Sequence, residues 1–125
     1  PNLYGKWNSP DIYSVTLSFK PYMVDVQTDL QEFAKNETIK KAKSIIKREF
    51  IKIISDDSFQ MGKPIERKKV EAYVEKTFGE AINKGRITDL TYKDTGSKTN
   101  PILCTLSYHI EMLDLRDRIE SAKIK

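Results

Sequence analysis

Alternation of apolar and polar residues predicts strands in the first and last thirds of the chain. Over residues 13–19, apolar side chains at every second position are separated by Ser and Thr. A period of two with β-branched and aromatic residues is typical of a strand with one buried face. The same alternation runs over residues 102–111 and, less regularly, over residues 86–93. A short edge strand is expected over residues 22–26.

Apolar residues three or four apart predict two main helices between these strands. The first is expected over residues 36–54, with Asn36 or Thr38 as its N-terminal cap. A polar segment, residues 55–63, is expected to form a loop after it.

The second helix is expected to begin near Pro64, because the fixed φ of proline suits a first turn. Gly85 is expected to end it in a left-handed C-cap. A short last helix, capped by Asp114, should follow the final strand.

The order strand, helix, helix, strand, strand, helix predicts an α+β fold, with a small mixed sheet and the two main helices on one of its faces. Residues 11–125 are expected to form this single domain. Residues 1–10 are rich in Asn, Gly, Ser and Pro and are expected to form an irregular arm.

Composition indicates a solvated globular domain. The chain has 125 residues, of which 38% are hydrophobic and 32% charged, and no run approaches the ~20 apolar residues of a spanning helix, so no membrane insertion is expected. The lone Cys104 fits a reducing compartment. The first residues lack a signal peptide, and an initial Pro is what remains when an initiator Met is removed, so a complete small protein is expected.

Candidate chemistry is sparse, and the sequence predicts neither an enzyme nor a metal or cofactor site. His109 and Cys104 are five residues apart on a strand, which places them on opposite faces. The carboxylates have no spacing typical of a catalytic or metal-binding pair, and there is no glycine-rich phosphate loop.

The net charge of +4 leaves nucleic acid open as a partner. Phosphate contacts use Lys and Arg, which the first helix offers on one face. The alternative function is therefore a small nucleic-acid-binding module that uses Lys40, Lys43, Lys47 and Arg48.

The whole chain, read in order, resembles the small baseplate wedge or sheath-initiator proteins of contractile phage tails and related injection machines, and the C-terminal domain of tail sheath subunits. The similarity covers residues 22–123. The segments that carry it are Val24-Asp25-Val26, Ser44-Ile45-Ile46, residues 70–82, Gly85-Arg86-Ile87-Thr88-Asp89-Leu90 and Leu106-Ser107-Tyr108-His109-Ile110.

This resemblance implies a structural subunit of a virion tail, assembled in the host cytoplasm with other baseplate proteins and sheath subunits as a hetero-oligomer. Such proteins exchange strands with their neighbours, and here residues 13–19 and 102–110 are the candidates. The interaction residues so implied are Tyr13, Val15, Leu17, Phe19, Ile102, Leu106 and Tyr108, with Arg86 as an anchor of the junction between the second helix and the next strand. Pairing of both strands within the domain is the open alternative.

Overall fold

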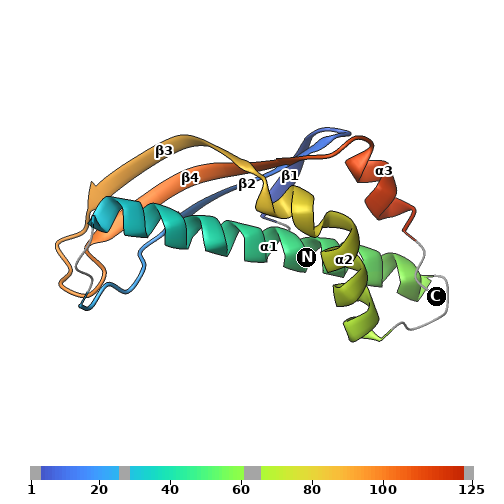
Figure 1. Ribbon diagram of the computed structural model, residues 1–125, viewed down its shortest axis with the longest axis horizontal. Coiled ribbons are helices and arrows are strands. Elements are labelled where there is room, and N and C mark those ends of the chain that lie inside the picture. Colours follow the sequence, from blue (N-terminus) through green and yellow to red (C-terminus); the bar gives the residue numbers. More distant parts are fainter. Residues whose placement is uncertain (1–3, 26–28, 61–65, 123–125) are drawn as a thin grey trace.

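One antiparallel sheet lies over a long helix (Figure 1). The computed structural model describes residues 4–25, 29–60 and 66–122, of which residues 57–60 are described by their backbone alone. This arrangement confirms the predicted α+β class. The elements, in chain order, are β1 (Gly5–Ser9), β2 (Ile12–Phe19), α1 (Leu30–Gln60), α2 (Arg67–Asn83), β3 (Arg86–Asp94), β4 (Ile102–Glu111) and α3 (Leu115–Glu120).

The strands are ordered β1-β2-β4-β3, and each described pair is antiparallel, so the sheet is not mixed. The central pair, β2 and β4, aligns Tyr13 with Ile110 and Leu17 with Leu106. These residues belong to the inward sets of the two strands, as the predicted alternation requires.

The strand β1 corrects the prediction of an irregular arm over residues 1–10 for Gly5–Ser9, and residues 1–3 lie outside the described residues. Trp7 packs edge-on against Tyr13, with 4.8 Å between ring centroids, and stacks at 6.4 Å on Phe50 of α1. Burial of these aromatic surfaces overrides the low strand propensity of Gly, Asn and Ser. The edge strand expected from residue 22 is absent over residues 22–25, and residue 26 lies outside the described residues.

Helix α1 is longer than predicted at both ends. It begins at Leu30 because Asp29, and not Asn36 or Thr38, accepts the N–H of Gln31 at 3.0 Å. It continues to Gln60, through residues 55–60 of the predicted loop, and residues 61–63 lie outside the described residues. Ile54 is only 1% exposed, and its burial outweighs the low helix propensity of the Ser and Asp residues that follow.

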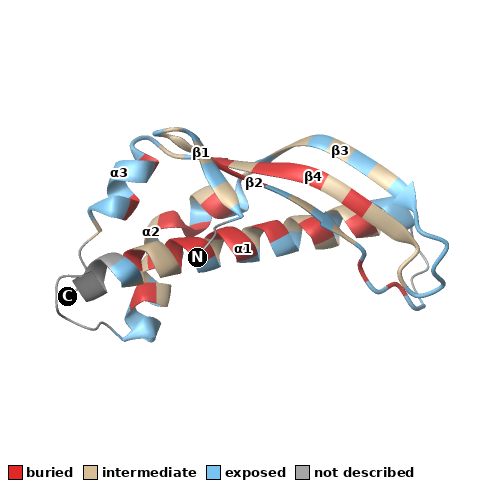
Figure 2. Ribbon diagram, turned by 180° about the vertical axis from the view of Figure 1, so that it is seen from behind, coloured by how far each residue is buried: buried red, intermediate tan, exposed pale blue. Residues whose placement is uncertain are grey.

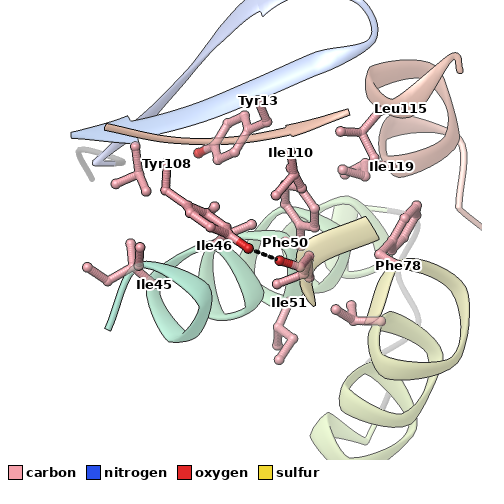
Figure 3. Close-up of a cluster of buried hydrophobic side chains, with 14 of the residues drawn as sticks. Tyr13, Ile45, Ile46, Phe50, Ile51, Phe78, Tyr108, Ile110, Leu115 and Ile119 are labelled. Carbon is pink, nitrogen blue, oxygen red and sulfur yellow. Dashed lines mark hydrogen bonds between the residues drawn. The ribbon is translucent and has the colours of Figure 1, made fainter. Parts of the chain in front are cut away.

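The core lies between the inner face of the sheet and the two main helices (Figures 2 and 3). Phe50 of α1 stands at its centre, with its ring centroid 5.2 Å from that of Tyr13 and 5.7 Å from that of Phe78. The fully buried residues of the helices include Ala42, Ile46, Phe50, Val70, Val74 and Phe78. Pro64 lies outside the described residues, and the described part of α2 begins at Arg67.

The outer face of the sheet carries hydroxyl groups that bond across the strands. Thr16 pairs with Ser107 at 2.7 Å and Ser18 with Thr105 at 2.6 Å. His109 bridges three strands, because its ring nitrogens contact Ser14 of β2 at 2.5 Å and Thr88 of β3 at 2.7 Å. The imidazole is therefore paired across the strands.

The junction of α2 and β3 is held by Tyr108 of β4. Its hydroxyl donates to the carbonyl of Ile82 at 2.5 Å and accepts the N–H of Gly85 at 2.9 Å. A Cβ atom at residue 85 would overlap the Tyr108 ring. Gly85 is thus required by a close approach and not by the predicted left-handed cap. The C-cap of α2 is Lys84, with φ −96°, and the described glycine with positive φ is Gly96.

We expect Gly85→Ala to destabilise the protein by about 1–3 kcal/mol, because the new methyl group must displace the buried Tyr108 ring. Urea unfolding measures this change. Gly79→Ala is the matched control: it lies inside α2, where its Cβ would meet only the movable side chain of Glu75. That variant should gain about 0.5–1 kcal/mol. Equal effects of the two substitutions would contradict the close approach.

Candidate protein-binding groove

The predicted interaction residues divide between the core and the sheet margin. Tyr13, Val15, Leu106 and Tyr108 are at most 2% exposed and pack against the helices, so a partner cannot contact their side chains. The regular alternation that suggested these four residues marks the face that packs on the protein's own helices. Leu17, Phe19 and Ile102 are half-buried, and Arg86 is exposed.

The two candidate exchange strands also differ. Strand β4 lies between β2 and β3, so both of its edges are already paired and it cannot accept another strand. Strand β2 pairs with β4 over its whole length, but β1 reaches only as far as Val15. Within the described residues, the edge of β2 from Thr16 to Phe19 on the β1 side has no partner strand.

The opposite edge of the sheet, β3, is protected against strand addition. Its register shifts between Thr88 and Thr91, and Asp89 in this bulge has φ 56°. Arg86 and Lys93 place charges along the same strand. Bulges and charged side chains are the usual devices that keep an edge strand from pairing with another chain.

A groove of about 450 Å³ lies along the open half of β2. Its floor and walls come from the strand edge and from one face of α1, and the strand contributes both hydroxyl and apolar side chains. The lining residues are Tyr4, Thr16, Leu17, Ser18, Lys41, Ser44, Ile45 and Arg48.

The helix wall of the groove alternates charge and apolar surface. Lys41, Ile45 and Arg48 are spaced four and three residues apart, which places them on one face of α1. The Lys41 ammonium lies 4.7 Å from the centroid of the Phe19 ring, at the end of β2. Within the described residues, neither Lys41 nor Arg48 forms an ion pair, so both charges are available to a ligand.

Glu49 of α1 holds the backbone of Tyr4, one of the residues that line the groove. This carboxylate is 4% exposed, accepts the backbone N–H groups of Tyr4 and Gly5, and accepts the Tyr13 hydroxyl. Three donors compensate the cost of burying its charge. Because these N–H groups turn toward α1, the chain bends at Tyr4 and β1 begins only at Gly5.

The predicted basic face is only partly available. Lys40 forms an ion pair with Glu37 at 3.0 Å, and Lys47 forms one with Glu75 of α2. Lys43 is half-buried and Arg48 is exposed beside the groove. Within the described residues, the Arg86 side chain forms neither a hydrogen bond nor an ion pair, and Tyr108 holds the junction that Arg86 was expected to anchor.

A reactive centre is not evident in the described part of the chain. No three His, Cys, Asp or Glu side chains gather there as metal ligands would. Cys104 is buried in the core, on the face opposite to His109.

The pKa of His109 is lowered below its ordinary value, chiefly by burial and then by the nearby Arg86. No described helix has the length and apolar character needed to cross a bilayer.

Comparison with protein-family models, with curated proteins and with solved structures gives no match.

Sequence reasoning missed the groove because it missed β1. Without β1, the sequence could not show that β2 has a partner on its β1 side over only half of its length. One signal was present: Lys6, Trp7 and Asn8 alternate in polarity and precede Pro10-Asp11, a turn signal. Lys41 is not among the four residues predicted to bind nucleic acid, although its position seven residues before Arg48 places the two on one helix face.

We expect the free energy of unfolding to fall above about pH 10, and Tyr13→Phe to weaken that fall. Burial, the hydrogen bond to Glu49 and its charge together raise the pKa of Tyr13 well above its ordinary value. The unfolded chain therefore releases this proton near pH 10 while the folded protein keeps it. The resulting slope is about 1.4 kcal/mol per pH unit for this residue.

Urea unfolding at several pH values between 9 and 11 measures the slope, with the phenylalanine variant of exposed Tyr22 as the control. Burial also raises the pKa of Tyr108, so a smaller decline should persist in the Tyr13 variant. An identical slope in wild type and Tyr13→Phe would contradict the buried hydroxyl–carboxylate contact.

Proposed function

We propose that the chain is a non-catalytic structural subunit that joins neighbouring proteins by accepting an extended segment onto its sheet. The assembly that its sequence resemblance favours is the baseplate of a contractile phage tail or injection machine. There it would sit in the virion tail, among other baseplate proteins and sheath subunits, and template the start of the sheath.

The observation that carries this proposal is the half-open edge of β2 beside a groove. An unpaired strand edge offers alternating N–H and C=O groups to an incoming chain, and the adjacent side chains set its register. Residues 16–19 of β2 pair with β4 without a bulge, whereas the pairing of β3 with β4 contains one. Of these two strand edges, the open half of β2 is the one suited to strand addition.

Nucleic-acid binding through the first helix is the weaker alternative. Two of its four proposed phosphate-binding residues, Lys40 and Lys47, are engaged by carboxylates. A ligand would have to displace these ion pairs, although exposed pairs of this kind contribute only about 0–1 kcal/mol.

We expect the tagged chain, produced in the cells that naturally contain it, to co-sediment with a tail-sized particle that resists nuclease. Leu17→Lys, which places a charge in the groove lining, should reduce its incorporation at least tenfold. Leu113→Lys, at an exposed site, is the matched control. Circular dichroism checks that both variants are folded. A wild-type chain found only free, or in a complex that nuclease dissolves, would overturn the baseplate proposal.

A further inference from the structure

The charges of the groove point to the chemistry of its ligand. Its lining includes Lys41 and Arg48 but no carboxylate. The nearest acid in sequence, Glu49, is buried and already accepts three hydrogen bonds. A groove that carries one sign of charge favours a ligand of the other sign.

The positions of the two cations on α1 set the spacing of the charges expected in the ligand. Lys41 and Arg48 are seven residues apart, about 10 Å along the axis of α1, and Ile45 lies between them. On an extended chain, side chains that share a face are separated by about 7 Å, and alternate members of that set by about 13 Å. Long, flexible Lys and Arg side chains span the difference between 10 and 13 Å.

We propose that the groove binds an extended acidic segment of a partner protein, in which an acid, an apolar residue and an acid occupy positions i, i+2 and i+4. The segment adds to β2 at residues 16–19 as a new strand. Its two carboxylates bind Lys41 and Arg48, and its central apolar side chain packs against Ile45 and Leu17. This inference rests on the proposed function, because it names the partner chemistry of the same strand edge.

The structure favours a peptide over a nucleic acid at this site. The open backbone of β2 offers donors and acceptors in the two-residue repeat that a peptide strand matches. Stacking of bases requires several exposed aromatic rings, and Tyr4 is the aromatic residue among those that line the groove. The volume of about 450 Å³ lies within the range of specific ligand sites.

The test uses the full chain and fluorescent nine-residue peptides with the central sequence Asp-Thr-Val-Thr-Asp, measured by fluorescence anisotropy. A peptide with Asn in place of both Asp residues removes the charge at nearly the same shape, and a peptide with Lys in both places reverses the charge. We expect the Asn peptide to bind at least about tenfold more weakly than the Asp peptide, and the Lys peptide more weakly still. Binding of the Asp peptide should weaken as salt is added.

Two further Asp peptides test the backbone contact. One carries N-methyl groups on the odd residues and the other on the even residues. In an added strand, one set of N–H groups points to β2 and the other away, so one methylated peptide should lose binding at least tenfold and the other should keep it.

Variants of α1 test the two cations. The double variant Lys41→Glu, Arg48→Glu should prefer the Lys peptide to the Asp peptide. The double variant Lys43→Glu, Lys52→Glu makes the same charge change on the same helix but outside the groove lining, and should keep the preference for Asp. If the groove variant does not fold, Lys41→Gln with Arg48→Gln should still reduce the Asp preference at least fivefold.

The outcomes separate this inference from the proposed function. Equal binding of the Asp and Asn peptides, with loss on alternate methylation, would keep strand addition and overturn the acidic partner. If both methylated peptides still bind, strand addition is overturned, and the inference with it. Absence of binding by all peptides, or tighter binding of a 20-base-pair DNA duplex that depends on Lys41 and Arg48, would overturn both.

Discussion

The carboxylate of Glu49 lies beneath one edge of the sheet, and the shape of that edge depends on it. By accepting the N–H groups of Tyr4 and Gly5, it draws the incoming chain toward α1 and sets the first residue of β1. Since β1 starts opposite Val15, the rest of β2 lies beyond its reach. The same carboxylate fixes the Tyr13 hydroxyl, so a single buried charge couples the edge strand, the central pair and the helix.

The edge of β3 and the open half of β2 differ in how regular their pairing is. At β3, a bulge with Asp89 in a left-handed conformation interrupts the ladder, and charged residues flank it. At the distal half of β2, pairing with β4 continues in register to Phe19. Protection of one margin and exposure of the other is the asymmetry expected of a subunit that recruits one extended segment without polymerising through both edges.

How far the sequence predicts this protein depends on which faces of its elements are buried. The period-two stretches in β2 and β4 and the three-to-four spacing in α1 and α2 predict the fold class, because each has one face against a common core. Strand β1 was not predicted because its stability comes from the contacts of Trp7 with Tyr13 in the next strand and with Phe50, which is distant in sequence. The groove was not predicted for a related reason: strand order, and not local pattern, determines which strand edge is open. Gly85 shows the same limit, since its requirement lies in the position of the Tyr108 ring.

The hydroxyl ladder on the outer face has a consequence for how the domain meets other molecules. Thr16 with Ser107, Ser18 with Thr105, and His109 with its two partners satisfy one another across the strands. A partner that covers a surface whose polar groups are already paired gains little binding free energy, because each new hydrogen bond must replace an existing one. The broad side of the sheet therefore offers little to a partner and is left to water, so the lateral joining that we propose would use the margin alone.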